Sequence, residues 1–480
     1  MRRTKIVATL GPATDRPGML DRLVAAGLDA ARLNYSHGKA QDHAARAAAV
    51  RAAAITAGRE IGLIADLQGP KIRLECFAGG AVELVEGARF DIDADLAPEA
   101  GSVERVGVTY KELPGDVAAG DTLLVDDGRL VLGVERVRGR VIETTVVSGG
   151  TLSDHKGINR QGGGLSAPAL TDKDRADLRH ALAHGADYIA VSFPRSSADI
   201  ETARRLIHDA GGSAGIIAKM ERAEALDHAD DIIAAADCIM IARGDLGVEI
   251  GDARLPPAQK MLVARARRHY KTVITATQMM ESMIENPLPT RAEVFDVANA
   301  VLDGTDAVML SGETSVGAYP DRAVAAMSRV CEGAEAEWSD PAGSTLPDAR
   351  FERVDEAIAM SAIYCANRIG VKAIAALTES GRTTLWMSRM NTAIPVFALS
   401  PHPATLRKVT LYRDVYPVAF DVSTIPYNEA TREVLAVLKS RGVVGDGDQV
   451  IITKGDLHGH TGGTNGMKIV TVGDFVEHVG

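Results

Sequence analysis

The sequence predicts an α/β protein built on a (β/α)8 or TIM barrel, with a β-barrel lid domain inserted after the third strand and a C-terminal α/β domain. Three observations predict this fold. Eight short apolar runs end in polar residues, and helical sequence separates most of them. One interval between the runs is alternating and turn-rich instead. Four further apolar runs follow a polar stretch near the C-terminus.

The eight apolar runs predict the barrel strands. The Ala-rich, charged sequence between most of them, such as SSADIETARRLIHDAGG, has the pattern of a helix that connects two parallel strands. Eight such units favour a closed barrel, whose chemistry gathers at the C-terminal ends of its strands. The runs are 5–11, 30–36, 61–69, 188–193, 215–220, 238–244, 272–278 and 307–313.

The interval from Pro70 to about Ala167 predicts the inserted β domain. A helix resumes at Thr171, where Thr-x-x-Asp predicts a capping box, and the polar stretch 338–350 indicates a linker. Beyond the linker, strands are predicted at 372–378, 394–400, 449–455 and 467–473. We therefore expect the barrel at 1–69 and 168–340, the lid domain at 70–167, and the C-terminal domain at 341–480.

Composition and charge exclude some classes of protein. The formal net charge of -11 argues against nucleic acid as a partner. No apolar run reaches the roughly 20 residues of a membrane span, and the apolar run near the N-terminus is too short for a signal peptide. Four cysteines without CxxC spacing favour reduced thiols. We expect a cytoplasmic protein with neither a membrane nor a nucleic acid as partner.

Polar residues at the predicted strand ends are the candidate site. Alternate residues of a strand share a face, so Lys219 with Glu221, and Arg243 with Asp245, should each present a cation and an acid together. One alternative is that barrel mouths are polar simply because they meet solvent. The full set is Arg32, Asn34, Ser36, Asp66, Ser192, Lys219, Glu221, Arg243, Asp245, Thr277, Ser311 and Glu313.

Glu221 and Asp245 are the candidate metal ligands. They follow neighbouring strands, and two carboxylates with few other protein ligands suit Mg²⁺, which keeps water and leaves room for substrate phosphates. The alternative is a pair of structural salt bridges with Lys219 and Arg243.

Many stretches, in order, carry a resemblance to a known family. They are RLNYSHG (32–38), DLQGPKIR (66–73), LSDHKGIN (152–159), IIAKMERAEAL (216–226), ARGDLGVE (242–249), ATQMMESM (276–283), PTRAEVFDVANAV (289–301) and LDGTDAVMLSGETSVGAYP (302–320). Together they resemble the pyruvate kinase family over nearly the whole chain. The resemblance implies the last step of glycolysis, transfer of the phosphoryl group of phosphoenolpyruvate to ADP with Mg²⁺ or Mn²⁺, and a homotetramer.

The resemblance also implies roles for the strand-end residues. Lys219 would stabilise charge on the transferring group and the enolate, and Thr277 would lie on the side of proton delivery. Arg32 and Arg73 would hold phosphate. The backbone of Arg243, Gly244 and Asp245 would receive the substrate carboxylate. The side chains of Glu221 and Asp245 would hold the divalent metal. The residues matching nucleotide-side positions are Asn34, His37, Arg73 and Lys156.

The monovalent-cation site departs from the commonest family pattern. Many members are expected to bind K⁺ at the counterparts of Asn34, Ser36, Asp66 and the backbone of Leu67. Those members typically read Asp-Thr-Lys-Gly-Pro-Glu over 66–71, where this chain reads Asp-Leu-Gln-Gly-Pro-Lys. We expect the ammonium of Lys71 to replace the ion, so that K⁺ is not required. The alternative is that Lys71 is a solvated surface lysine.

Two other features bear on the lid. Residues 159–164 read NRQGGG where relatives commonly have Asn-Leu-Pro-Gly, a change expected to loosen the hinge. If the lid closes, Lys156 and Asp127 would lie over the nucleotide. Asp127 is equally well explained as a turn residue in VDDG.

The C-terminal domain holds a candidate effector loop, TESGRTT (378–384), between a strand and a predicted helix. By resemblance it would bind a phosphate of a sugar phosphate or nucleotide, with HTGGTN (460–465) as a second glycine-rich loop. Both are alternatively plain turns. The candidate residues are Thr378, Ser380, Gly381, Arg382 and Thr383.

Two competing functions are weaker. Related barrels with Glu and Asp metal ligands act as lyases or aldolases, but they lack the lid and the sequence contexts of Lys219 and Thr277. A sensor that has lost catalysis is disfavoured because none of the matched catalytic positions is substituted.

Overall fold

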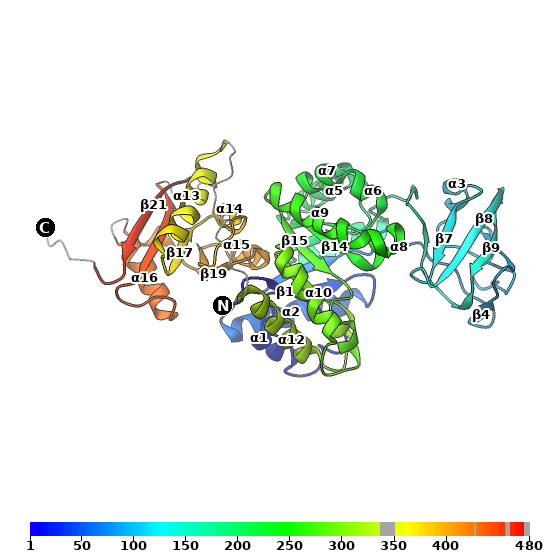
Figure 1. The fold of residues 1–480 in the computed structure, drawn as a ribbon, viewed down its shortest axis with the longest axis horizontal. Helices are drawn as coiled ribbons and strands as arrows, with labels where there is room; N and C mark the ends of the chain where they lie inside the picture. The colour runs from blue at the N-terminus through cyan, green and yellow to red at the C-terminus, as the bar shows by residue number, and fades with distance from the viewer. Residues whose placement is uncertain (337–350, 427–428, 457–460, 475–480) are drawn as a thin grey trace.

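The fold was analysed in a computed structural model that describes residues 1–336, 351–426, 429–456 and 461–474. Figure 1 shows three bodies in a row: the C-terminal domain, the central barrel, and the inserted domain at the far end. The predicted linker 338–350 lies outside the described residues. Among the described helices, none is both long and apolar enough to cross a membrane.

The predicted barrel is confirmed. Eight parallel strands close in the order β1-β16-β15-β14-β13-β12-β3-β2. Each predicted run contains its strand, because strands buried on both faces read as continuous apolar sequence. The strands are β1 (Lys5–Thr9), β2 (Ala30–Asn34), β3 (Gly62–Asp66), β12 (Tyr188–Val191), β13 (Gly215–Met220), β14 (Cys238–Ala242), β15 (Thr272–Ala276) and β16 (Ala307–Leu310).

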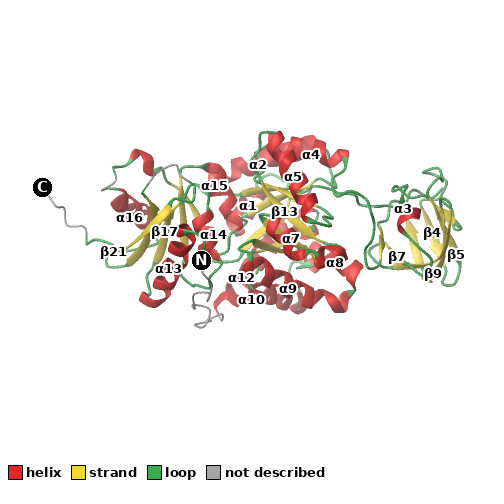
Figure 2. Ribbon diagram, turned by 90° about the horizontal axis from the view of Figure 1, so that it is seen from above, coloured by secondary structure: helices red, strands yellow, loops and turns green. Residues whose placement is uncertain are grey.

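Helices surround this barrel, as the view from above shows (Figure 2). The predicted capping box opens α4: the Thr171 side chain accepts from the Asp174 amide, and the Asp174 carboxylate accepts from the Thr171 amide at 2.9 Å. The helices are α1 (Met19–Ala26), α2 (Ala40–Ala57), α4 (Asp172–Ala183), α5 (Ser197–Asp209), α6 (Ala223–Asp227), α7 (Ala229–Ala235), α8 (Arg243–Ile250), α9 (Leu255–Arg268), α10 (Arg291–Asp303), α11 (Gly312–Ser315) and α12 (Pro320–Ala336).

The inserted domain leaves the barrel after β3 and returns before α4. It has a six-stranded sheet, β11-β7-β8-β9-β5-β6, a two-stranded sheet, β10-β4, and an apolar core of its own. Its elements are β4 (Ala81–Leu84), β5 (Arg89–Asp93), β6 (Arg105–Val106), α3 (Leu113–Asp116), β7 (Thr122–Val125), β8 (Leu130–Arg138), β9 (Val141–Ser148), β10 (Gly150–Ser153) and β11 (Ile158–Arg160). We call this domain the lid.

The C-terminal domain is a five-stranded sheet, β19-β18-β17-β20-β21, flanked by helices. The sequence pattern missed β19, because Pro417 interrupts it; an edge strand tolerates the missing amide. Of the predicted loop 460–465, residue 460 lies outside the described residues, and Thr464 and Asn465 belong to β21 instead. The elements are α13 (Val354–Ile369), β17 (Ala373–Leu377), α14 (Arg382–Ser388), β18 (Val396–Ser400), α15 (Pro403–Lys408), β19 (Val415–Ala419), α16 (Ala430–Ser440), β20 (Gln449–Gly455) and β21 (Thr464–Thr471).

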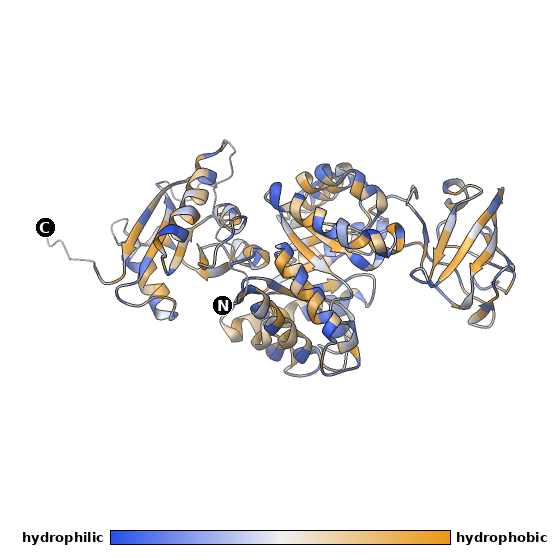
Figure 3. Cartoon of the chain, viewed as in Figure 1, coloured by the Kyte–Doolittle hydropathy of each residue, from blue (hydrophilic) through white to orange (hydrophobic). Residues whose placement is uncertain are grey.

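Apolar residues concentrate on the strands of the barrel and of both flanking domains, whereas polar residues lie on outer helix faces and loops (Figure 3). The side chains along the strands therefore pack in the cores of the domains. The polar residues that could take part in chemistry lie at the strand ends.

Candidate active site

The ammonium of Lys219 lies at the centre of the polar cluster at the barrel mouth. Its Nζ donates to Ser192 Oγ at 2.8 Å and lies 3.1 Å from Glu221 Oε2 and 3.4 Å from Asp66 Oδ1. Lys219 and Glu221 therefore present a cation and an acid together, as the alternation of strand residues predicted. The Lys219 side chain is only 11% exposed, and a largely buried lysine with two carboxylates beside it stays charged. Accordingly, the two acids outweigh the effect of burial and raise the pKa of Lys219.

Asp66 is held between two cations. Its carboxylate accepts from Arg32 Nε at 2.7 Å on one side and faces Lys219 on the other. Burial alone would raise the pKa of Asp66, but the charges of Arg32 and Lys219 hold it below its ordinary value. Arg32 also donates to Thr9 Oγ1 at 2.9 Å. Asp66 thus fixes the orientation of both cations.

The Glu221 carboxylate is fully buried and only half satisfied. Oε1 accepts from the Phe193 amide at 2.8 Å, whereas Oε2 has no hydrogen-bond partner among the described residues. Oε2 lies near Lys219, but without hydrogen-bond geometry. Burial, with the nearby charges of Asp245 and Asp66, raises the pKa of Glu221 to about 7 against the opposing charge of Lys219. A buried carboxylate oxygen that has an ion-pair partner but accepts no hydrogen bond fits a ligand of a divalent cation.

The predicted pairing of Arg243 with Asp245 is wrong. β14 ends at Ala242 and α8 begins at once, so the two residues lie on a helix rather than on alternate positions of a strand. The Arg243 guanidinium turns away, donating to Asp296 at 2.7 Å and to the Thr277 carbonyl at 2.6 Å. Asp245 is left as an acid close to Glu221, and its own partner is Lys71.

Thr277 and Gly244 meet at the start of α8. The Gly244 amide donates to Thr277 Oγ1 at 2.9 Å, and that hydroxyl donates to the Ala276 carbonyl at 2.6 Å. Thr277 adopts the left-handed conformation with φ 66°, which is rare for a β-branched residue. Such strain persists only where the surroundings hold the residue in place, and it concentrates at functional sites.

Lys71 is partly buried and contacts the candidate metal acid. Its Nζ lies 3.4 Å from Asp245 Oδ1, and its side chain is 27% exposed, so it is not the fully solvated lysine of the alternative. The structure does not bring it into hydrogen-bond contact with Asn34, Ser36 or Asp66. The charge of Lys71 acts on His37, which follows Ser36 in the sequence. Burial first, and then the charges of Arg73, Arg32 and Lys71, lower the pKa of His37.

Three of the residues expected to hold potassium accept hydrogen bonds from protein groups through their oxygens. The Ser36 amide donates to Asn34 Oδ1 at 3.1 Å. The Leu67 carbonyl accepts from Ser192 Oγ at 2.7 Å, and Asp66 pairs with Arg32.

Lid residues meet the barrel at this mouth. Lys71, Asp127 and Gly128 line one cavity together with Gly244 and Asp245. Arg73 donates to the His155 carbonyl at 2.9 Å, and Lys156 pairs with Asp126 at 2.8 Å, so both cations rest on lid partners. Arg73, Arg32 and Lys71 lie near enough to His37 for their charges to help lower its pKa, whereas Lys156 contacts a lid residue.

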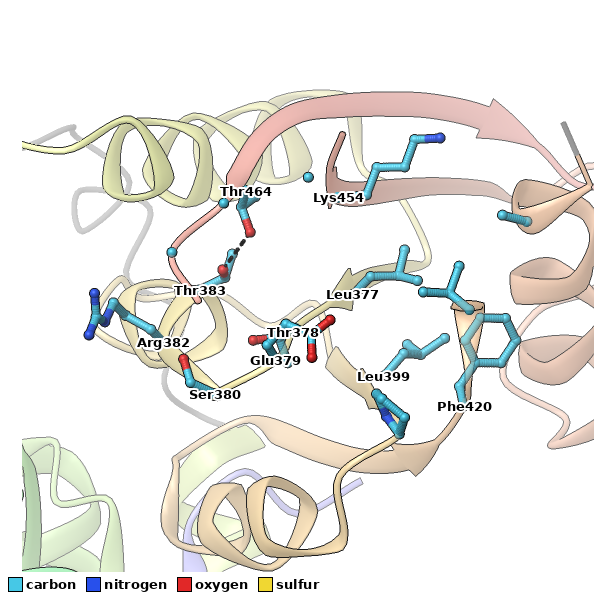
Figure 4. Close-up of a pocket in the computed structure, with 16 residues that line it drawn as sticks. Leu377, Thr378, Glu379, Ser380, Arg382, Thr383, Leu399, Phe420, Lys454 and Thr464 are labelled. Atoms are coloured by element: carbon cyan, nitrogen blue, oxygen red, sulfur yellow. Dashed lines mark hydrogen bonds between the residues drawn. The ribbon is translucent and has the colours of Figure 1, made fainter. Parts of the chain in front are cut away.

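The predicted effector loop surrounds a pocket in the C-terminal domain. Thr378, Ser380, Arg382 and Thr383 line it, but Gly381 does not; its amide donates to Thr378 Oγ1 at 3.0 Å. Figure 4 shows Arg382 and Lys454 on opposite sides of the pocket, with Thr378 and Glu379 between them. Thr383 at the start of α14 and Thr464 at the start of β21 share a hydrogen bond of 2.8 Å. Glu379 pairs with His402 at 2.6 Å, which offsets its charge when the histidine is protonated.

Comparison with known proteins decides the family. Residues 1–324 match the pyruvate kinase barrel domain and residues 356–470 match the pyruvate kinase alpha/beta domain. The chain belongs to the pyruvate kinase family. It is therefore an enzyme of the phosphotransferase class, and the resemblance seen in its motifs is confirmed.

Relatives match this pyruvate kinase family member from end to end. Pyruvate kinase II of Salmonella typhimurium is 54% identical over 98% of this chain and 99% of its own length. A pyruvate kinase of Haemophilus influenzae is 51% identical over 95% of this chain and 96% of its own. A crystal structure of a pyruvate kinase from Cryptosporidium parvum has a TM-score of 0.92 and 35% identity, covering 98% of this chain and 96% of its own.

Two polar residues of this pyruvate kinase mouth had no assigned role from the sequence. Ser192 links Lys219 to the Leu67 carbonyl, and Thr9 accepts from Arg32. Thr9 is a polar residue at the C-terminal end of β1, so it fits the same pattern as the strand-end residues that were selected from the sequence. It was passed over because a threonine at a strand end is less distinctive than an arginine such as Arg32.

Proposed function

We propose that this chain transfers the phosphoryl group of phosphoenolpyruvate to ADP, giving pyruvate and ATP. The observation that carries the proposal is the Lys219 ammonium, fixed between Ser192, Asp66 and the buried carboxylate of Glu221. Two polyanionic substrates repel each other by about 4 kcal/mol per unit-charge pair at 4 Å and an effective dielectric near 20. Cations already fixed in place offset this repulsion without reorganisation.

Glu221 and Asp245 are the proposed ligands of Mg²⁺ or Mn²⁺. Their carboxylates are close enough for Asp245 to raise the pKa of Glu221, and a bound divalent cation would relieve that repulsion. When bound, the metal supplies positive charge to substrate oxygens. The chain's own residues do the positioning.

The substrates are assigned to groups on this mouth. Arg32 and Arg73 are planar forks suited to phosphate oxygens, whereas the compact Lys219 suits the moving phosphoryl group and the enolate. The Gly244 amide, Asp245 and Thr277 form the proposed carboxylate and proton-delivery side. The nucleotide side is proposed to be Asn34, His37, Arg73 and Lys156.

Lys71 is proposed to replace a monovalent cation, so that turnover does not need K⁺. Support comes from its place beside Asp245 and from its electrostatic reach to His37. Asn34, Ser36, Asp66 and Leu67 then form a site that already satisfies most of its own oxygens.

A coupled assay tests the reaction and its metal together. With Mg²⁺, phosphoenolpyruvate and ADP, we expect equal amounts of pyruvate and ATP, and Glu221→Gln should lower kcat by about 10²–10³-fold, as for other transition-state charge contacts. Glu201→Gln, on the outer helix α5, is the matched control and should behave as the wild type. Pyruvate formed with inorganic phosphate and no ATP would mean that the phosphoryl group goes to water, and unchanged phosphoenolpyruvate and ADP would favour a lyase or aldolase.

Activation by a phosphorylated metabolite is proposed at the pocket lined by Thr378, Ser380, Arg382 and Thr383. Hydroxyl groups and a guanidinium suit a phosphate of a sugar phosphate or nucleotide. At subsaturating phosphoenolpyruvate, at least one compound of a panel of sugar phosphates and AMP should raise the rate, and Arg382→Ala should abolish that activation. A rate that no compound changes would refute the proposal.

We also propose that the chain forms a homotetramer and works in the cytoplasm. Phe295 on α10 and the nearby Leu288 are 70% and 68% exposed, and the edge strand β21 exposes Met467 and Ile469, so two faces carry uncovered apolar side chains. All four cysteines are free, which suits a reducing compartment. Sedimentation velocity should give four chains; a stable monomer would contradict the assembly.

The domain limits are proposed at 1–69 with 168–340, 70–167, and 341–480. Support comes from β3 ending at Asp66 and α4 starting at Asp172, with the lid elements between them.

A further inference from the structure

The lid returns to the barrel through Arg-Gln-Gly-Gly-Gly, residues 160–164, which we call the glycine strap. Gly162, Gly163 and Gly164 have φ angles of 82°, 82° and 93°, in the region that favours glycine. Composition alone predicted a loosened hinge at this place. The contacts of the strap hold it against two barrel helices instead.

Two strap amides donate to the barrel. The Gly162 amide donates to the Glu249 carbonyl near the end of α8 at 3.1 Å, and the Gly164 amide donates to the Glu224 carboxylate on α6. On the lid side, Arg160 donates to the Gly163 carbonyl at 3.1 Å and to Asp121 beside β7 at 3.0 Å. The strap is therefore tied to both bodies that it connects.

The backbone at Gly163 lies close against the Glu224 carboxylate. A Cβ placed on Gly163 would collide with the Glu224 carboxylate, which would have to move away, whereas a Cβ on Gly162 would meet nothing within 4 Å. Oε2 of Glu224 is buried and has no hydrogen-bond partner among the described residues. Only glycine at 163 permits this approach.

The two helices that hold the strap follow the strands of the proposed metal acids. α6 begins two residues after Glu221, and α8 contains Asp245. The Glu249 carboxylate accepts from the Ala223 amide at 2.8 Å, which joins the two helices. Arg222, directly after Glu221, donates to the Leu165 carbonyl just beyond the strap at 3.0 Å.

We propose that Glu224 and the glycine strap form a latch that positions the lid over the metal acids for nucleotide binding. The inference rests on the proposed function of Glu221, Asp245 and the lid cations. Glu224 is a positioning residue, since it touches the strap and not the reacting atoms. Releasing the latch lowers the fraction of molecules whose lid presents Arg73 and Lys156, and the apparent affinity for ADP falls by the same factor.

Four variants test the latch: Gly163→Ala, Gly162→Ala, Glu224→Ala, and the double variant Gly163→Ala/Glu224→Ala. Gly162→Ala is the matched control, since it introduces the same backbone strain without the collision. We expect Gly163→Ala and Glu224→Ala each to raise KM for ADP about tenfold, with a smaller change in KM for phosphoenolpyruvate. The double variant should be no worse than either single one, because both remove one contact.

Hydrogen exchange of the strap amides provides a readout independent of turnover. Exchange at 160–165 should be faster in Gly163→Ala and Glu224→Ala than in Gly162→Ala, with all variants unfolding at similar temperatures. Equal exchange and kinetics for Gly163→Ala and Gly162→Ala, or multiplying effects in the double variant, would overturn the latch. If the wild type made no ATP, the proposed function would fail, and exchange alone would still judge the latch.

Discussion

Replacing Lys219 by methionine is expected to lower kcat by about 10²–10³-fold, with little change in KM for phosphoenolpyruvate. The reason is that its ammonium is held by Ser192, Asp66 and Glu221 before any substrate arrives, so its charge acts most where charge develops in the transition state. Steady-state kinetics with saturating Mg²⁺ measure the effect.

Lys260→Met is the control for the Lys219 variant. Lys260 pairs with Asp303 on the surface and is 59% exposed, so its loss should change neither kcat nor stability by much. Thermal unfolding of Lys219→Met must be followed as well, since Asp66 keeps Arg32 but Glu221 loses its cation. A folded Lys219→Met protein with a tenth or more of the wild-type kcat would contradict the assigned role.

Replacing Lys71 by glutamate is expected to create a requirement for K⁺. The change puts a carboxylate beside Asp245 in place of an ammonium, and the phosphates of both substrates then face added repulsion. In tetramethylammonium buffer the rate should fall about 10- to 100-fold, as for the loss of a charged contact of roughly 1.5–3 kcal/mol. Adding KCl should restore most of the rate.

Lys111→Glu makes the same charge change on the lid surface, where Lys111 is 43% exposed and faces Glu75. It should leave the rate unchanged with and without KCl. If KCl failed to rescue Lys71→Glu, the ammonium would have some role other than that of the ion.

The barrel was predictable because its strands are buried on both faces and carry no alternation that a sheet with one wet face would show. The lid was predictable because its strands do alternate between apolar and polar residues, unlike the strands and helices of the barrel on either side of it. β19 was not predicted because it contains Pro417, and proline is tolerated in a strand mainly at the edge of a sheet. Which strand lies at an edge depends on the order of the strands in space, which the sequence pattern does not give.

The site was predictable only as far as local geometry reached. Lys219 and Glu221 share a face as two-residue alternation requires, but the same rule failed for Arg243 because its strand ended one residue earlier. The partners that tune the acids come from other strands or the lid: Arg32 for Asp66, Phe193 for Glu221, and Lys71 for Asp245. No spacing in the sequence specifies such contacts, because packing decides them.

The central claim is that the ammonium of Lys71 replaces a potassium ion in the active site. The most direct test is the rate at which the wild-type protein forms pyruvate without potassium. The assay contains phosphoenolpyruvate, ADP and Mg²⁺ in tetramethylammonium buffer, with ATP measured in parallel. We predict full turnover, with pyruvate and ATP in equal amounts and no change when KCl is added. A rate that collapses in this buffer and returns with KCl would contradict the role of Lys71.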